Sequence, residues 1–497
     1  MYLKEENKIW IATGKNGTQP LTMLPRMMNR HGLVTGATGT GKTTTIKVLA
    51  EAFSEMGTSV FMADIKGDVS GMCRPGEPSA TINERVQSMG IKDFAFSAFP
   101  VRFFDVYGQK GIPVRTTVSS MGPLLLARIL DLNPTQTGVL QIIFKFADDN
   151  GMLLLDFKDL RSIVQFAGDN AKSFTSEYGN VTAASVGAIQ RSLLSLESAG
   201  ADKFFGEPEL DLSDWLIPDE YGRGVINILD CVTLFQNPLL YSTFLLWMLS
   251  ELYEMLPEVG DLAQPKLVFF FDEAHLLFNS APKALLQKVE QVIRLIRSKG
   301  VGIFFITQSP SDIPNTVLSQ LSNKIQHALR AYTPNDQKAI KAAAASFRPN
   351  PEIDCESAIS DLATGEVLLS VLDDAGAPGM IQRGFIVPPR CSFGVAEPEL
   401  VDQITKSSPL YAKYYQSYDR YSAYEILQEN AQRKAQQQEL EALEAQRLKE
   451  QKQPAQPKSR SRSSSSPLEK ALSSSMSQIG RSVSRELVRG LFGTYRK

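Results

Sequence analysis

Short apolar-rich runs alternate with stretches of helical periodicity along most of the chain. The runs are residues 33–35, 59–63, 225–229, 266–271 and 301–307. Runs of this length without strict polar alternation are typical of strands buried on both faces of a sheet. Between them, residues 44–54 and 283–299 place apolar side chains three and four positions apart, which predicts helices. Strands joined by helices favour right-handed crossovers, so the pattern predicts an α/β fold with a mostly parallel sheet.

Weaker elements continue this pattern on either side. Further strands are expected at residues 324–331, 366–372 and 384–387, and a strongly apolar helix at 238–256. Residues 1–30 alternate weakly and predict a small β lead-in. Residues 31–395 are therefore expected to form the main domain.

Residues 114–216 interrupt the strand pattern. Helical periodicity appears at residues 122–132, 137–148, 157–167 and 183–197. These stretches predict a helical insertion lying over the sheet. The insertion is interpreted as a packing subdomain, and a surface for a partner or for nucleic acid is the alternative.

Residues 396–450 are expected to be helical. Between residues 404 and 427, six tyrosines recur at helical spacing: Tyr411, Tyr414, Tyr415, Tyr418, Tyr421 and Tyr424. Aromatic residues at this spacing favour packing of a helix against the body, with base stacking as an alternative. Residues 428–450 are rich in Glu, Gln and Ala and predict a further helix.

The last segment, residues 451–497, predicts a tail. Residues 451–466 are rich in Pro, Ser and Arg, which is typical of a disordered linker. The apolar residues Ile479, Val483, Leu487 and Leu491 recur every four positions beside Arg481, Arg485 and Arg489. This pattern predicts a basic amphipathic helix that docks on a protein partner. Anionic lipid, nucleic acid and the chain's own body are the other surfaces it fits.

The composition is that of an ordinary globular protein, 43% hydrophobic and 21% charged. The net charge of −2 hides an asymmetry, because ten Lys and Arg residues follow Glu450 against two acidic ones, and the body is therefore acidic. The four cysteines show no C-x-x-C spacing, which favours a reducing compartment over zinc or disulfides. We see neither a secretory signal nor an integral membrane segment, so a cytoplasmic protein is expected.

The first chemical motif begins where the strand at residues 33–35 ends. It reads Gly36-Ala37-Thr38-Gly39-Thr40-Gly41-Lys42-Thr43 and has the spacing G-x-x-x-x-G-K-T. The glycines let several backbone N–H groups point into one concavity, and the helix that continues from Thr44 presents its N-terminus to the same place. Such a loop binds a polyphosphate, with Lys42 reaching the β and γ oxygens and the Thr43 hydroxyl binding Mg²⁺.

The second motif, Asp272-Glu273, follows the apolar run 266–271. Burying two adjacent carboxylates is costly unless they are paired or bind metal. Beside a phosphate-binding loop, Asp272 is expected to hold Mg²⁺ through its water shell. Glu273 is expected to polarise the water that attacks the γ-phosphate.

Two further polar residues stand at strand ends. Gln308 ends the strand 301–307 and is expected to sense the γ-phosphate from beside the loop. Asp64 ends the strand 59–63, where it either helps to place water or Mg²⁺ or caps the turn that follows. Glu273 and Gln308 together favour the additional-strand P-loop ATPases, since kinase-like and GTPase-like proteins usually lack that glutamate.

Several stretches together resemble the HerA–FtsK superfamily, namely residues 29–43, 64–68 and 297–310. The whole chain, including residues 485–490, resembles the bacterial YjgR-like group of HerA-like ATPases. This resemblance implies a RecA-like fold that works as a homo-oligomer, usually a hexameric ring, with ATP between subunits. Arg297 matches the arginine finger that a neighbouring subunit supplies, and Arg330 is the other candidate. A cation placed there stabilises the charge of the transition state.

The resemblance also implies work on double-stranded DNA, moved through the ring. Archaeal HerA-like helicases carry a β-barrel domain ahead of the loop that docks a nuclease. Only 35 residues precede Gly36, so we expect that domain to be missing and the nuclease partnership not to transfer. An ATP-driven remodeller of a protein partner and a nucleotide-gated scaffold are the rival functions. Glu273 argues against the scaffold, because a scaffold needs no group that activates water.

Overall fold

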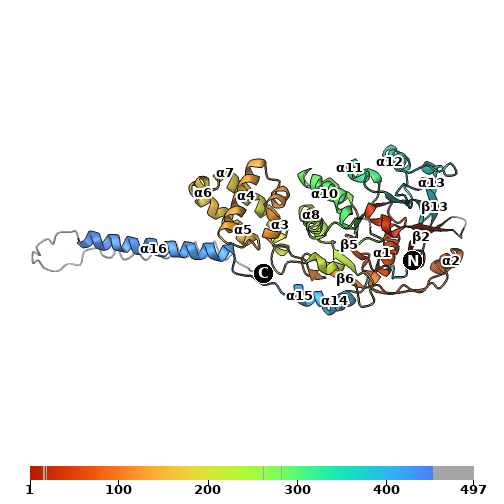
Figure 1. The fold of residues 1–497 in the computed structure, drawn as a ribbon, viewed down its shortest axis with the longest axis horizontal. Coiled ribbons are helices and arrows are strands. Elements are labelled where there is room, and N and C mark those ends of the chain that lie inside the picture. Colours follow the sequence, from red (N-terminus) through yellow and green to blue (C-terminus); the bar gives the residue numbers. More distant parts are fainter. Residues whose placement is uncertain (15–16, 18, 261, 281–282, 452–497) are drawn as a thin grey trace, which may run out of the picture. The chain divides into compact units, whose positions relative to one another are not determined.

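The computed structural model describes residues 1–451 apart from 15, 16, 18, 261, 281 and 282. Within these residues thirteen strands form one sheet (Figure 1). Its parallel part runs β11 (Asn323–Gln326), β4 (Gly32–Thr35), β10 (Val301–Thr307), β9 (Leu267–Phe271), β5 (Ser59–Asp64), β8 (Ile226–Asp230) and β6 (Val101–Asp105). The expected α/β fold with a mostly parallel sheet is confirmed, and β10 lies between β4 and β9 as an additional-strand, RecA-like core requires.

Antiparallel strands extend the sheet beyond β11. They are β12 (Glu366–Ser370), β13 (Gln382–Ile386), β2 (Lys8–Gly14), β3 (Pro20–Met23) and β1 (Tyr2–Leu3). At the opposite edge, β7 (Ile112–Pro113) pairs with β6 in parallel. Since β2 pairs with β13, the lead-in at residues 1–30 belongs to the main sheet. Residues 1–430 form one compact unit, so the expected boundary after residue 395 falls inside it.

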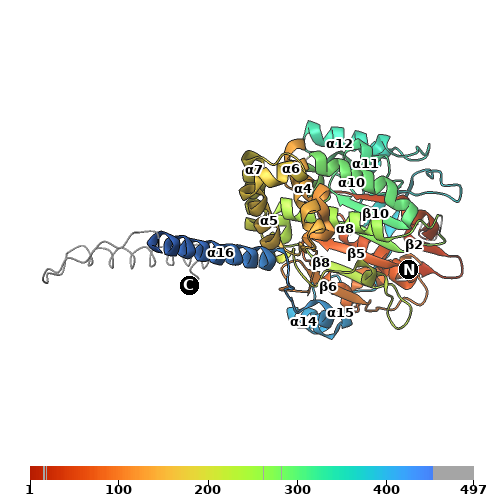
Figure 2. The ribbon, with the colours of Figure 1, turned by 60° about the vertical axis from the view of Figure 1, so that its left-hand side comes forward.

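Helices cover both faces of the sheet, because successive side chains of a strand point to opposite faces. On β9, Phe269 and Phe271 pack in one core and Phe270 packs in the other. The helix α1 (Lys42–Glu55) packs in the same core as Phe270, and α8 (Pro238–Met255) and α10 (Lys283–Ile296) pack in the same core as Phe269. Figure 2 shows α8 and α10 next to each other. Each such fully buried aromatic side chain contributes about 1.5–3 kcal/mol to folding.

The helical insertion is present as predicted. It comprises α3 (Val118–Ile129), α4 (Pro134–Asp149), α5 (Phe157–Asp169), α6 (Ala171–Glu177) and α7 (Ala183–Ser198). The helix α3 contacts α8 and α10, so the insertion shares the core on their side of the sheet. Its first helix, α3, begins four residues before the expected helix start at Gly122, and Gly122 itself has a φ of 70° at which the helix kinks.

Several shorter elements complete the compact unit. These are α2 (Ala80–Ser88), α9 (His275–Ser280), α11 (Asn315–Leu318), α12 (Pro334–Ala345), α13 (Cys355–Asp361), α14 (Pro398–Ser407) and α15 (Pro409–Tyr414). In the part of the chain that the structure describes, no helix is long and apolar enough to cross a membrane. All four cysteines are free thiols.

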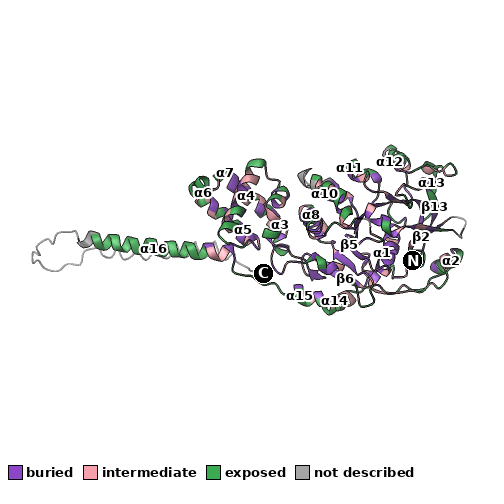
Figure 3. Cartoon of the chain, in the orientation of Figure 1, coloured by how far each residue is buried: buried purple, intermediate pink, exposed green. Residues whose placement is uncertain are grey.

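The helical tyrosine spacing expected over residues 404–427 is interrupted after Tyr414. The helix α15 ends at Tyr414, which is buried and donates a hydrogen bond to Asp214. Tyr415, Tyr418 and Tyr421 are exposed by about half. The helix α16 (Ala423–Gln451) is exposed along most of its length (Figure 3). The predicted linker from residue 452 and the basic helix at residues 479–491 lie outside the described residues.

Candidate active site

The loop between β4 and α1 has the shape of a phosphate-binding loop. Gly36 follows β4, and Gly41 precedes α1 with a φ of 112° that favours glycine. A Cβ on Gly36 would lie 2.5 Å from Cβ of His327, so only glycine fits there. Thr38 and Gly39 are exposed at the top of the loop. The N–H groups of the first turn of α1 have no intrahelical acceptor and face the same opening.

Lys42 lies buried across this loop. Its Nζ donates hydrogen bonds to the backbone oxygens of Gly36 at 2.6 Å and of Ala37 at 3.1 Å. Burial lowers the pKa of Lys42, and the nearby charge of Lys66 lowers it further. The ammonium is therefore held at the concavity where a phosphate would bind.

His327 fastens the loop to the neighbouring strand. It follows β11, and its backbone N–H donates to Thr35 O at 2.7 Å. Its ring nitrogens lie 3.0 Å from Thr40 O and 2.8 Å from Oγ1 of Thr45. A carbonyl oxygen only accepts, so Nδ1 carries the proton and Nε2 accepts from the Thr45 hydroxyl. Burial lowers the pKa of His327 to about 3, with a smaller contribution from Lys42.

This neutral histidine predicts acid sensitivity. Between the unfolded pKa of about 6.5 and the folded pKa of about 3, the unfolded chain binds a proton at His327 that the folded chain does not. The contribution of His327 to the free energy of unfolding is therefore fully present above pH 6.5. As the pH falls below this value, the contribution decreases by up to about 1.4 kcal/mol per pH unit. We expect His327→Asn, which retains a donor toward Thr40, to lose less in Tm than wild type between pH 7 and pH 5. Equal losses would contradict this assignment.

Asp272 and Glu273 directly follow β9, and both are buried. Glu273 has a φ of 47°, a left-handed conformation that costs a residue with a side chain on the order of 1–3 kcal/mol. Oδ1 of Asp272 accepts the backbone N–H of Glu273 at 2.9 Å, which holds this conformation. Strain of this kind is concentrated at functional sites.

Lys66 reaches both carboxylates. Its Nζ lies 3.1 Å from Oδ2 of Asp272 and 2.7 Å from Oε1 of Glu273. Burial raises the pKa of Asp272. Burial also acts to raise the pKa of Glu273, but the hydrogen bond and charge of Lys66 outweigh it and the pKa is lowered. Oε2 of Glu273 is buried, lies 3.3 Å from Nδ1 of His275, and accepts no hydrogen bond from the described residues.

The turn after β5 positions Lys66 and Asp68. The Asp64 carboxylate accepts the backbone N–H groups of Gly67, Asp68 and Val69 at 2.7, 3.2 and 3.3 Å. Asp64 therefore caps this turn, which was one of its two expected roles. Burial and the neighbouring Asp68 raise the pKa of Asp64 to about 6. On the other side of the turn, the hydroxyl of Thr43 donates to Oδ2 of Asp68 at 3.1 Å.

A cavity of about 340 Å³ opens beside the loop. Ala37, Gln308 and Arg330 are among the residues that line it. Gln308 follows β10, which pairs with both β4 and β9, and so lies at the edge where the loop and the two carboxylates meet. Arg330 donates hydrogen bonds to the backbone oxygens of Ser360 and Leu362. Arg330 thus stands beside the loop of its own subunit.

Arg297 lies at the opposite end of the sheet. It begins the turn between α10 and β10, and its charge acts on His31, which precedes β4. Nε2 of His31 lies 2.8 Å from Ile293 O, and Nδ1 accepts the Ile303 N–H at 3.0 Å, so His31 ties α10 to β10. The seven residues of β10 separate Arg297 from the loop by about 20 Å. Arg297 therefore does not join the other candidate residues within one chain.

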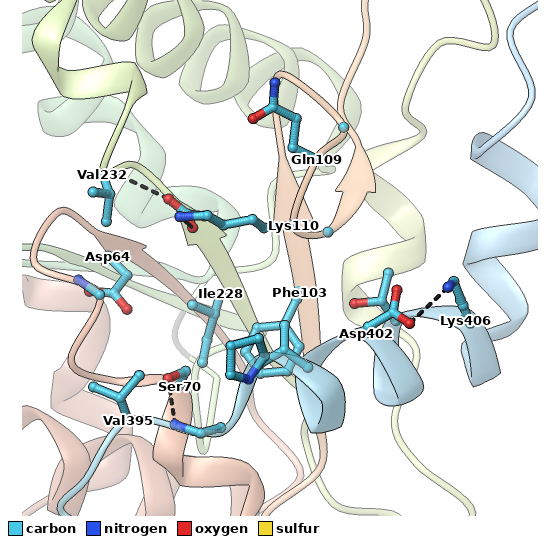
Figure 4. Close-up of a pocket in the computed structure, with 18 of the residues that line it drawn as sticks. Asp64, Ser70, Phe103, Gln109, Lys110, Ile228, Val232, Val395, Asp402 and Lys406 are labelled. Carbon is cyan, nitrogen blue, oxygen red and sulfur yellow. Dashed lines mark hydrogen bonds and ion pairs between the residues drawn. The ribbon is translucent and has the colours of Figure 1, made fainter.

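A second cavity of about 490 Å³ lies at the ends of β5, β8 and β6 (Figure 4). Phe103 contributes to its apolar wall. Two ion pairs line it, Lys110 with Asp230 at 3.2 Å and Lys406 with Asp402 at 2.7 Å. None of its described lining residues belongs to the loop after β4, but Asp64 and Gly67 line it, so it borders the turn that carries Lys66.

Sequence reasoning assigned no role to Lys66, Asp68 or His327. The first two stand in the stretch 64–68, where alternating acidic and basic residues after a strand were the available signal. His327 had a weaker signal, a single histidine after a short strand. The contacts of all three depend on which strands are neighbours, and that order is a property of the fold.

A family model described as helicase HerA-like C-terminal matches residues 10–497. The DNA double-strand break repair helicase HerA of Sulfolobus acidocaldarius is 21% identical over 348 residues, which cover 69% of this chain and 62% of that protein. The HerA helicase of Saccharolobus solfataricus is also 21% identical, covering 68% of this chain and 61% of that protein. The matched region thus spans less than two thirds of the length of these curated relatives.

Solved structures with a similar fold include the plasmid coupling protein TrwB. Its complex with ADP and Mg²⁺ has a TM-score of 0.51 at 15% identity, over 80% of this chain and 93% of that one. Its complex with a non-hydrolysable ATP analogue also has a TM-score of 0.51 at 15% identity, over 79% and 94%. At this identity the likeness concerns the fold.

Proposed function

The chain belongs to the helicase HerA-like C-terminal family, a group of P-loop ATPases of the HerA–FtsK type, and from this membership we propose a Mg²⁺-dependent ATP hydrolase that moves double-stranded DNA. The observation that carries hydrolysis is the Asp272–Glu273 pair at the end of β9, one strand away from β10 and two from β4. A buried, strained carboxylate such as Glu273 is suited to activating water and has no purpose in a protein that only binds nucleotide.

The oxygen atoms around the loop fit Mg²⁺. The hydroxyl of Thr43 and the carboxylate of Asp272 are hard oxygen donors, and the buried Oε2 of Glu273 accepts no hydrogen bond from the part of the chain that the structure describes. Thr43 and Asp272 would hold the ion, Asp272 through water. When bound, Mg²⁺ would neutralise charge on the β- and γ-phosphates.

The remaining steps belong to side chains of this protein. Backbone N–H groups from Gly36 to Thr44 and the Nζ of Lys42 bind the phosphates. Glu273 orients the attacking water and accepts its proton. Gln308, at the end of the intervening strand, contacts the γ-phosphate and reports its loss.

Lys42→Ala tests the binding role of the loop. A hydrogen bond from a charged group is worth about 1.5–3 kcal/mol, so nucleotide affinity should fall by about 10- to 100-fold. Fluorescent ATP-analogue titration measures this loss directly. Lys47→Ala, on the same helix with its Nζ on Ser392 and Phe393 oxygens, is the matched control and should retain affinity. Undiminished affinity in Lys42→Ala would contradict the loop assignment.

The proposals of a ring and of a DNA substrate are based on similarity to other proteins. Proteins named as HerA helicases act in DNA double-strand break repair, and TrwB is named as a plasmid coupling protein. We propose that this chain assembles as a hexameric ring, with each ATP between two subunits and double-stranded DNA in the channel. Support from the chain itself comes from Arg297, which lies too far from its own loop to act there.

Displacement of a triplex-forming strand from linear duplex DNA tests translocation. The proposal predicts ATP-dependent displacement by wild type and none by Lys42→Ala. ATP hydrolysis without displacement at any duplex length would refute DNA translocation. It would favour the rival function, an ATP-driven remodeller that engages a protein partner through the basic C-terminal segment.

A further inference from the structure

The ammonium of Lys66 lies against the carboxylates of Asp272 and Glu273, where a bound cation is expected. Its Nζ bridges Oδ2 of Asp272 and Oε1 of Glu273 at 3.1 and 2.7 Å. These are the distances of charge-assisted hydrogen bonds. Because an ammonium and a divalent cation repel each other at close range, each weakens the binding of the other to the same carboxylate.

The turn that carries Lys66 contacts both residues that would hold Mg²⁺, Thr43 and Asp272. Lys66 points to Asp272, and two positions later Asp68 accepts the hydroxyl proton of Thr43. The contact from Asp68 is compatible with a bound ion, because a hydroxyl can donate its proton while its lone pair binds metal. The contact from Lys66 opposes a bound ion, because it places a positive charge on the carboxylate that would hold the metal.

The Lys66 side chain can change its position, whereas the turn that carries it is held by hydrogen bonds. Three backbone hydrogen bonds to Asp64 hold the turn. The Lys66 side chain is 36% exposed, while Asp272 and Glu273 are 11% exposed. The long aliphatic stem lets the ammonium move into solvent without any change in the turn.

We propose that Lys66 is an internal competitor of the divalent cation at Asp272 and that the same ammonium pairs with Glu273 while the cation is absent. It keeps Glu273 occupied until Mg²⁺ arrives with nucleotide and then moves away, so water activation is coupled to cation binding. The inference rests on the proposed nucleotide site but not on hydrolysis.

Titration with Mn²⁺ followed by electron paramagnetic resonance, without nucleotide, tests this competition on the full chain. Lys66→Met should bind Mn²⁺ about tenfold more tightly than wild type, because a competing ion pair of ordinary strength is removed. Lys110→Met is the matched control, since Lys110 also pairs with a strand-end carboxylate, Asp230, at 3.2 Å. Equal Mn²⁺ affinity in Lys66→Met and wild type would overturn the proposal, as would the same gain in Lys110→Met.

A measurement on wild type covers the case in which Lys66→Met does not fold. Amine acetylation followed by mass spectrometry should label Lys66 several-fold more when Mg²⁺ and ADP are added, with Lys110 as internal reference. Unchanged or reduced labelling overturns the proposal. Both readouts follow cation binding, so a chain that passes them but hydrolyses no ATP would refute the proposed function alone. A chain that hydrolyses ATP but fails them would refute this inference alone.

Discussion

Replacing Arg297 with Ala is expected to lower ATP turnover by about 10³- to 10⁵-fold, the range for loss of an arginine finger. In its own subunit Arg297 stands at the start of β10, and the loop lies beyond the other end of that strand. It is half-buried near the surface rather than in the core. A role in catalysis therefore requires the nucleotide of a neighbouring subunit. Steady-state phosphate release measures the loss, and nucleotide affinity should change little.

Two controls separate this role from damage to the helix. Arg294→Ala, one turn earlier on α10 and exposed, should retain wild-type turnover. Mixed assemblies of Arg297→Ala and Glu273→Gln subunits should regain part of the activity, because an intact Arg297 then faces an intact Glu273. Mixed assemblies that form but show no recovery would rule out action across the interface.

Replacing Glu273 with Gln is expected to reduce turnover by about 10²- to 10⁴-fold while nucleotide still binds. The amide keeps the shape of the side chain and its place beside Lys66 but cannot accept a proton from water. Single-turnover hydrolysis and analogue binding, measured side by side, distinguish the two steps. Retained turnover in Glu273→Gln would show that another residue is the general base. Loss of nucleotide binding would show that Glu273 has a structural role.

The central strands were predictable because both faces of each are buried. Residues 301–307 are uninterrupted by charge, and the structure places β10 over the same residues. Strand β6 was missed because Arg102 interrupts its apolar run, and this side chain reaches out to donate to Asp214 O at 2.9 Å. Strand β11 was predicted too long, because the chain leaves the sheet early and Ala328 O accepts the N–H of Ala37 in the loop.

The part of the candidate site that consists of neighbouring residues in the sequence was predictable from their spacing. The glycines at positions 36, 39 and 41 have the positive φ values that the loop requires, so the motif could be recognised in the sequence. The pairing of Lys66 with Glu273 joins residues about 200 positions apart and depends on β5 lying beside β9. The separation of Arg297 from Arg330 depends likewise on which end of the sheet each occupies. Such relations follow from topology and are not encoded in spacing.

ATP hydrolysis by the purified chain, with and without double-stranded DNA, tests the central claim most directly. We predict phosphate release that requires Mg²⁺, rises several-fold with duplex DNA, and loses this stimulation at high salt as phosphate contacts weaken. Glu273→Gln supplies the background rate. Wild-type release no faster than that background, with nucleotide bound and in the presence of DNA, would contradict the account.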